Sequence, residues 1–137
     1  MLEKLQRIKN YLENLIEIKP NYGIILGTGL NNLVDSLEII KSISYENIPE
    51  FPKSTVEGHE GNLIFAKINN IDVMIMQGRF HFYEGYSMEE VTLPIRLMKI
   101  LNSSNNNFNN YFYRKPLFFI KSYFEYKELR NLLSSFK

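Results

Sequence analysis

The fold of this chain is decided by residues 62–86, which read NLIFAKINNIDVMIMQGRFHFYEGY. Two apolar runs within this stretch, Asn62–Ile68 and Ile71–Gln77, have the length and composition of strands. Only Asn69-Asn70 separates them, which is typical of a two-residue hairpin turn. The stretch therefore predicts a β-hairpin, and residues 78–86 after it predict a loop.

The residues before this hairpin alternate between helical and strand patterns. Leucines and isoleucines spaced three and four apart predict an amphipathic helix over residues 2–18, ended by Pro20. Residues 22–26 predict a buried strand that passes into a glycine turn. Apolar residues at helical spacing then predict a short helix: Leu30, Leu33, Val34 and Leu37. Residues 38–45 resemble a second strand, and residues 46–61, with two prolines and two glycines, predict a loop.

A helix is expected after the hairpin and its loop. The sequence Ser87-Met88-Glu89-Glu90 is a capping-box pattern, and the helix is expected to run to about Leu101. Pro94 predicts either a kink in this helix or a later start. Strands that alternate with helices, together with one hairpin, predict an α/β domain with a mixed β-sheet flanked by helices.

The composition restricts the class of protein. The chain has 137 residues, the length of about one domain, and its net charge of +1 excludes the strongly basic surface of a dedicated nucleic-acid binder. It has no cysteine, so disulfides, zinc–thiolate sites and thiol nucleophiles are excluded. Apolar runs are too short for a membrane span. The N-terminus resembles an amphipathic helix rather than a signal peptide, so we expect a cytoplasmic protein that does not act at a membrane.

The composition changes near residue 101. Residues 1–101 contain all seven glycines, whereas residues 102–137 contain none and hold ten aromatic residues and seven asparagines. This tail of uncertain structure is either an ordinary aromatic-rich segment or the product of a reading frame or splice pattern that departs from the ancestral one. We expect several of its aromatic side chains to be exposed.

The first segment that could carry chemistry is Gly27-Thr28-Gly29. A glycine turn between a strand and a helix presents backbone N–H groups and a helix dipole to an anion such as phosphate, and the Thr28 hydroxyl adds a donor. Position 32 is Asn32, so the spacing is not that of a dinucleotide-binding G-x-G-x-x-G motif. Alternatively, such a turn only connects the strand tightly to the helix and binds no ligand.

The second segment follows the hairpin, at the expected carboxyl end of a strand, where α/β sheets usually bind ligands. Arg79 offers a guanidinium fork for phosphate, and His81 can donate to an anion. Tyr83 adds a ring and a hydroxyl, and Glu84 could hold the His81 imidazole in one tautomer. The alternative is an exposed polar loop with a salt bridge and aromatic packing.

The third segment, residues 54–61, contains His59, the other of the two histidines. A histidine flanked by glycines suits a ligand contact, although a surface histidine is the commoner outcome. His59 and His81 alone supply too few ligands, so we expect no metal site. The aromatic, basic tail lacks a recognisable motif for nucleic acid, and we expect no nucleic-acid partner.

Together the three segments resemble the trimeric, low-molecular-mass purine nucleoside phosphorylases. The matching stretches are YGIILGTGL (22–30), IPEFPKSTVEGHEG (48–61), MQGRFHFYEGY (76–86) and VTLPIR (91–96). Methylthioadenosine phosphorylases share the glycine turn but are not expected to carry the loop that follows the hairpin. The resemblance covers about residues 5–101 and implies a truncated, nucleoside phosphorylase-like α/β fold, with 1–101 as the N-terminal part of the domain and 102–137 as an unrelated-looking tail.

This resemblance implies a pentosyltransferase of purine salvage. In the family, phosphate attacks C1′ of a purine ribonucleoside or deoxyribonucleoside and yields the free base and a pentose 1-phosphate. Inorganic phosphate is a co-substrate, no metal or organic cofactor is implied, and the family is homotrimeric. The resemblance assigns phosphate binding to Thr28, Arg79 and His81, ribose contact to Tyr83 and His59, and catalysis to His81 oriented by Glu84.

The chain also departs from the family pattern. The family usually has serine at the position of Thr28, and Asn31 and Asn32 replace glycines that commonly follow the turn. The resemblance stops at Leu101, whereas family chains continue with the residues that read and protonate the purine. The alternative function is therefore an inactive fragment that binds phosphate at most, or that oligomerises with an intact paralogue.

Overall fold

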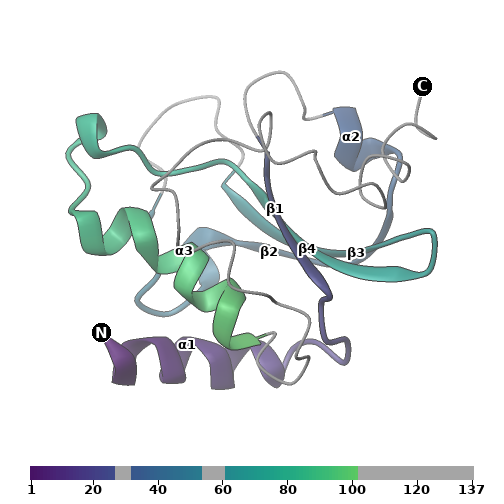
Figure 1. The fold of residues 1–137 in the computed structure, drawn as a ribbon, viewed down its shortest axis with the longest axis horizontal. Coiled ribbons are helices and arrows are strands. Elements are labelled where there is room, and N and C mark those ends of the chain that lie inside the picture. Colours follow the sequence, from purple (N-terminus) through teal and green to yellow (C-terminus); the bar gives the residue numbers. More distant parts are fainter. Residues whose placement is uncertain (27–31, 54–60, 102–137) are drawn as a thin grey trace.

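The computed structural model describes residues 1–26, 32–53 and 61–101. The described elements, in chain order, are α1 (Leu2–Glu13), β1 (Tyr22–Leu26), α2 (Asn32–Asp35), β2 (Glu38–Ser44), the 3₁₀ turn η1 (Tyr45–Asn47), β3 (Asn62–Ile68), β4 (Ile71–Gln77), the 3₁₀ turn η2 (Phe82–Glu84) and α3 (Met88–Leu101). The four strands form one sheet in the order β1-β4-β3-β2 (Figure 1). The expected tail, residues 102–137, lies outside the described residues.

The predicted hairpin is confirmed. Strands β3 and β4 pair antiparallel without a register shift, from Asn62 opposite Gln77 to Ile68 opposite Ile71. Both turn residues have positive φ, 48° at Asn69 and 65° at Asn70. Positive φ at both central positions matches the twist of a two-residue hairpin, and asparagine tolerates it better than most residues.

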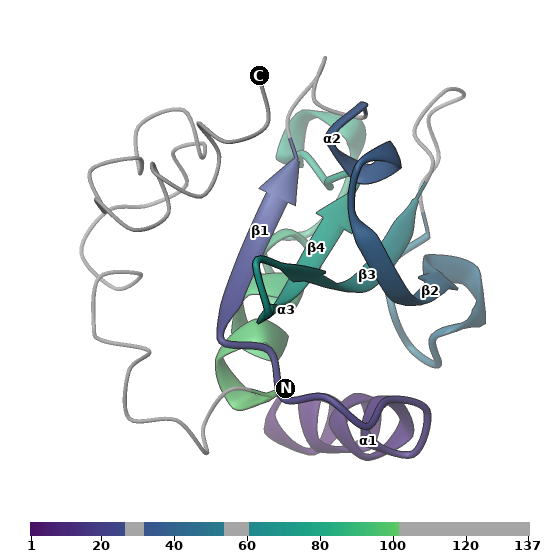
Figure 2. The same cartoon turned by 90° about the vertical axis from the view of Figure 1, so that its right-hand side faces the viewer.

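The sheet is mixed, as predicted. Strand β2 pairs antiparallel with β3, whereas β1 runs parallel to β4, with Leu26 opposite Gln77. Figure 2 shows the arrows of β1 and β4 pointing the same way. The last residues of these two strands are therefore neighbours at one edge of the sheet.

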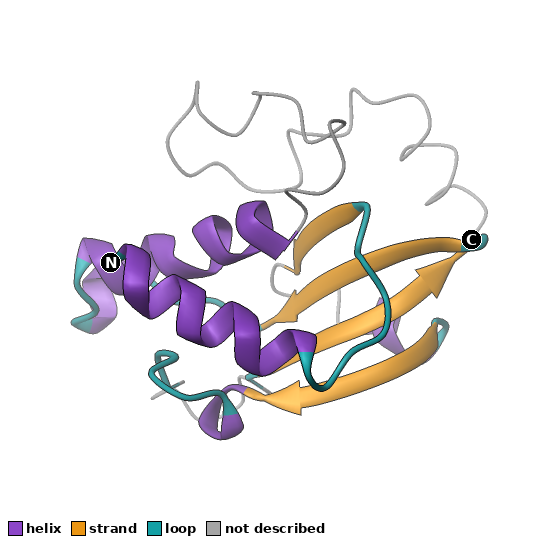
Figure 3. Cartoon of the chain, turned by 90° about the horizontal axis from the view of Figure 1, so that it is seen from below, coloured by secondary structure: helices purple, strands orange, loops and turns teal. Residues whose placement is uncertain are grey.

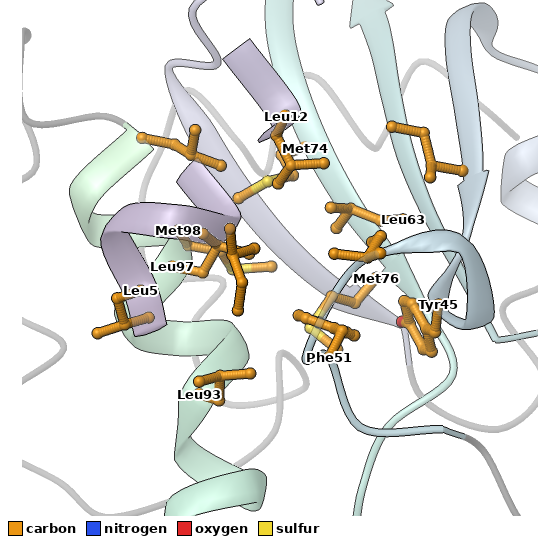
Figure 4. Packing of buried hydrophobic residues seen from close by; sticks show 14 of the residues in the cluster. Leu5, Leu12, Tyr45, Phe51, Leu63, Met74, Met76, Leu93, Leu97 and Met98 are labelled. Carbon is orange, nitrogen blue, oxygen red and sulfur yellow. The ribbon is translucent and has the colours of Figure 1, made fainter. Parts of the chain in front are cut away.

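Helices α1 and α3 lie next to each other on one side of the sheet (Figure 3). Their apolar residues pack with those of β3 and β4 in one cluster, whose labelled members in Figure 4 are Leu5, Leu12, Tyr45, Phe51, Leu63, Met74, Met76, Leu93, Leu97 and Met98. A second cluster contains the alternate residues of β3 and β4, including Ile64 and Ile75, with Val34 of α2. Both faces of the central strands are thus buried, which explains why these strands appear in the sequence as continuous apolar runs.

Two sequence predictions about the helices need correction. The first helix was expected over residues 2–18 but ends at Glu13. The Leu15 N–H bonds to the Leu12 carbonyl three residues back at 2.8 Å, which tightens the last turn, and Leu15 is 39% exposed. The apolar spacing therefore continues past the helix into the connection that leads to β1.

The last helix begins at Met88, so the late start that Pro94 suggested is wrong; Pro94 lies buried inside α3. The capping box that was predicted from the sequence is present. The Ser87 N–H donates to Glu90 Oε2 at 2.8 Å, and the Glu90 N–H donates to Ser87 Oγ at 3.2 Å. The hydrogen bonds from Ser87 lower the pKa of the Glu90 carboxyl below its ordinary value, so the cap is charged at neutral pH.

Strand β2 ends at Ser44, one residue before its predicted end, because Tyr45 starts η1. Both expected loops, 46–61 and 78–86, are largely irregular where they are described, and each contains residues of a 3₁₀ turn. In the described parts of the chain, no helix is long and apolar enough to cross a membrane.

Candidate active site

The loop over residues 78–86 starts where two parallel strands end side by side. Gly78 follows the last residue of β4, and that residue, Gln77, is the register partner of Leu26 at the end of β1. Ligands of α/β sheets commonly bind beyond the carboxyl ends of such strands. The predicted glycine turn with Thr28 comes directly after Leu26 in the sequence but lies outside the described residues, as does His59.

Gly78 meets the opposite loop at close range. Its φ is +107°, and a Cβ added there would lie 3.2 Å from the Gly61 backbone nitrogen. The Tyr45 hydroxyl donates to the Gly78 carbonyl at 2.8 Å, and the Tyr45 N–H donates to the Gly61 carbonyl at 2.8 Å. The start of the 78–86 loop is thereby held against η1 and the start of β3.

Substitution of Gly78 by alanine should therefore lower the free energy of unfolding by roughly 2–4 kcal/mol, through backbone strain and crowding against Gly61. Gly85 is the matched control, because its φ is +92° but a Cβ there would meet nothing within 4 Å. Gly85→Ala should cost only about 1 kcal/mol, from strain alone. Urea unfolding of both variants measures the difference, and equal losses would contradict the close packing of Gly78 on Gly61.

The underside of the loop is aromatic and buried. Phe80 contacts three rings, with centroid distances of 5.4 Å to Tyr45, 5.9 Å to Phe51 and 5.1 Å to Tyr86. The Tyr86 hydroxyl donates to the Lys53 carbonyl at 2.6 Å. Burial raises the pKa of Tyr45 far above its ordinary value, so its phenol stays protonated and remains a donor. We call Tyr45, Phe51, Phe80 and Tyr86 the aromatic cluster.

His81 and Glu84 form the polar centre of the loop. His81 Nδ1 lies 2.9 Å from Glu84 Oε1, and the His81 N–H donates to Glu84 Oε2 at 3.3 Å. The bond from the His81 N–H to the Glu84 carboxylate is part of a capping box around η2, and both side chains are mostly buried, at 18% and 13% exposed. A carboxylate beside Nδ1 favours the tautomer that carries the proton there, so any contact of His81 with a ligand would use Nε2. The predicted pairing of Glu84 with His81 is confirmed as a contact.

Tyr83 lies over the same imidazole. Its ring stacks on His81 with a centroid distance of 4.8 Å and an angle of 20° between the planes. Tyr83 is 81% exposed, so one face of its ring and its hydroxyl are accessible. Arg79 is half-buried and precedes His81 by two residues, with the buried Phe80 between them in the sequence. The structure thus brings His81, Tyr83 and Glu84 together and places Arg79 on the same loop.

Sequence reasoning missed the support beneath these residues. Phe80 and Tyr86 carry a weak signal, because they are apolar residues at both ends of a polar stretch, whereas nothing local distinguishes Tyr45 from other strand-end residues. Among the residues that the structure describes, no group of three or more potential metal ligands gathers.

The chain is similar to known enzymes over about three quarters of its length. It is 48% identical over 101 residues to purine nucleoside phosphorylase 1 of Bacillus subtilis, a match that covers 74% of this chain and 37% of that protein. It is 41% identical over 99 residues to the purine nucleoside phosphorylase of Rattus norvegicus, which covers 72% and 34%. No protein-family model matches the chain.

Solved structures of purine nucleoside phosphorylases are also similar to this chain. A purine nucleoside phosphorylase from Schistosoma mansoni, in complex with acetate, superposes with a TM-score of 0.68 at 46% identity, covering 73% of this chain and 37% of that one. A purine nucleoside phosphorylase in complex with ribose-1-phosphate gives 0.65 at 46% identity, covering 74% and 37%. A further S. mansoni structure, with inosine, gives 0.64 at 44% identity.

The mixed sheet, its flanking helices and these structural neighbours define part of a nucleoside phosphorylase-like α/β fold. The chain spans little more than a third of the length of the relatives named here. The chain is therefore similar to a partial segment of purine nucleoside phosphorylases.

Proposed function

We propose that the 78–86 loop is the phosphate- and ribose-binding part of a purine nucleoside phosphorylase site. Arg79 and His81 bind phosphate together with Thr28, while Tyr83 contacts the ribose with His59, and Glu84 orients His81. The observation that carries this proposal is the bond between His81 Nδ1 and Glu84 at the carboxyl end of β4, beside the end of β1. The ribose-1-phosphate complex of a similar structure supports the choice of ligand.

The proposed reaction is phosphorolysis of a purine ribonucleoside or deoxyribonucleoside. A phosphate oxygen forms a bond to C1′ as the bond from C1′ to the purine nitrogen breaks, which yields a pentose 1-phosphate and the free base. Positive charge develops on the sugar in the transition state, so a phosphate dianion fixed beneath C1′ both attacks and stabilises it.

Each described residue has a physical part in this step. The Arg79 guanidinium presents two parallel N–H donors to phosphate oxygens. The Glu84 carboxylate accepts from Nδ1–H and fixes the His81 ring. Nε2 then accepts a hydrogen bond from the protonated oxygen of a hydrogen phosphate ion, or donates to a bare phosphate oxygen when the imidazole carries both protons. The exposed Tyr83 ring gives the sugar an apolar surface and a hydroxyl. The proposal includes no metal or organic cofactor; the family's homotrimeric assembly and a cytoplasmic location are part of the same proposal.

Calorimetric titration of the 137-residue chain with inorganic phosphate tests the site. Arg79→Ala should raise the Kd for phosphate about 10- to 100-fold, because charge-assisted hydrogen bonds are worth about 1.5–3 kcal/mol. Arg96→Ala is the matched control, because it removes the same charge from an exposed position on α3 and should leave the Kd unchanged. Equal effects of the two substitutions would mean that only net charge matters, and the proposed site would be wrong.

A further inference from the structure

We propose that Tyr45 and Tyr86 are positioning residues that hold the 78–86 loop, and with it His81 and Arg79, in the geometry needed for phosphate. The inference rests on the proposed function for its ligand, but its structural part concerns the His81 ring itself.

The two tyrosines exchange hydrogen bonds between two chain segments. Tyr45 begins the segment 45–53, and its hydroxyl donates to the carbonyl of Gly78, the first residue of the loop. Tyr86 is the last residue of the loop, and its hydroxyl donates to the carbonyl of Lys53, at the other end of that segment. Each segment thus supplies one phenol and one carbonyl, and both ends of the loop are fixed.

The rings between these two bonds complete the bracing. Phe51 of the first segment and Phe80 of the loop contact each other at 5.9 Å, and each also contacts Tyr45. Phe80 is 5% exposed and lies between Arg79 and His81 in the sequence. Because its ring is enclosed by three others, the backbone on either side of it has little freedom to rotate. This fixes the backbone positions of Arg79 and His81, from which their side chains extend.

The hydroxyls are needed for position rather than for burial. Phenylalanine would fill the same volume, and a buried phenol is costly unless its hydroxyl finds a partner. Tyr45 is 1% exposed and Tyr86 9% exposed, and both hydroxyls bond to backbone carbonyls of the opposite segment. These two bonds fix how segment 45–53 is aligned with segment 78–86. Ring packing alone would allow the two segments to slide past each other.

Tyr45→Phe and Tyr86→Phe test the inference, with Tyr11→Phe as the matched control. The Tyr11 hydroxyl also donates to a backbone carbonyl, that of Asn47, at 2.9 Å, but it joins α1 to η1 and touches neither end of the loop. Urea unfolding of all three variants identifies the conditions under which each variant is folded, and the readouts are measured under those conditions. If Tyr45→Phe leaves too little stability, the less buried Tyr86→Phe carries the test.

The first readout is the histidine ring spectrum of the unliganded 137-residue chain, measured by long-range proton–nitrogen NMR. The chain has two histidines, and a His59→Gln variant assigns their signals. His81 stacks on Tyr83 and bonds Glu84, so a shifted loop must change its ring signals. Both loop variants should move or broaden the His81 signals while Tyr11→Phe leaves them in place. Unchanged His81 signals in the loop variants would overturn the inference, whether or not phosphate binds.

The second readout is the affinity for inorganic phosphate. Each loop variant should raise the Kd about 5- to 10-fold, as expected when one hydrogen bond that positions the binding groups is lost, and Tyr11→Phe should not change it. If the wild-type chain binds no phosphate, the proposed function fails while the His81 signals still decide the positioning role. If phosphate binds and Arg79→Ala weakens it, but the loop variants do not, the positioning role is wrong and the proposed function stands.

Discussion

Replacement of Phe80 by alanine should lower the free energy of unfolding by about 3–5 kcal/mol, the usual cost of removing a buried aromatic side chain. Phe80 is 5% exposed and forms three of the four ring contacts of the aromatic cluster. Its loss would leave a cavity beneath the residues proposed to bind phosphate. Because domains are stable by only about 5–15 kcal/mol, this single substitution should bring the fold close to unfolding.

The control lies two residues further on. Phe82 is 65% exposed, and no ring contact of the aromatic cluster involves it, so Phe82→Ala should change the stability by no more than about 0.5 kcal/mol. Chemical denaturation of both variants, followed by circular dichroism, measures the two losses. A small loss for Phe80→Ala, similar to that for Phe82→Ala, would show that the aromatic cluster does not support the loop.

The second large effect concerns turnover. A polypeptide of these 137 residues, assayed alone, should release no measurable free base from inosine or guanosine. The chain covers 37% of its Bacillus subtilis relative, and by the resemblance the residues that read and protonate the purine have no counterpart among residues 1–101. Acid–base assistance of that kind is worth about 10²–10⁴ in rate. This polypeptide should therefore bind phosphate without catalysing phosphorolysis.

A coupled assay for hypoxanthine on monodisperse protein tests this expectation, with the Arg79→Ala variant run beside it. Turnover that Arg79→Ala abolishes would mean that residues outside the similar segment supply the missing chemistry, and the expectation would be wrong. Phosphate binding without turnover agrees with the alternative function, a fragment that binds phosphate or associates with an intact paralogue.

Much of the fold could be predicted because it follows from local patterns. The apolar runs of β3 and β4 and the asparagine pair between them specify a hairpin whatever surrounds it, and the structure has the same bounds for both strands. The capping box of α3 is also local, since Ser87 and Glu90 need only each other. The pairing of His81 with Glu84 belongs to the same category, because three residues separate them.

The features that escaped prediction depend on residues far apart in the chain. Helix α1 ends at Glu13 although the apolar spacing continues to residue 18, and the connection that follows reaches β1, where the Asn21 N–H bonds to the Asp72 carbonyl. The hydroxyl bonds of Tyr45 and Tyr86 each join residues 33 positions apart. No periodicity or motif encodes such pairs. Thr28, His59 and the tail remain predictions from the sequence, because they lie outside the described residues.

The most direct test of the account is a crystal structure of the chain grown with inorganic phosphate. The account predicts one phosphate beyond the carboxyl ends of β1 and β4, with its oxygens within hydrogen-bond distance of the Arg79 guanidinium, of His81 Nε2 and of the Thr28 hydroxyl, while His81 Nδ1 keeps its bond to Glu84. A phosphate bound elsewhere would contradict the proposed site. So would a structure in which Arg79 and His81 point to opposite sides of the loop and neither contacts the anion.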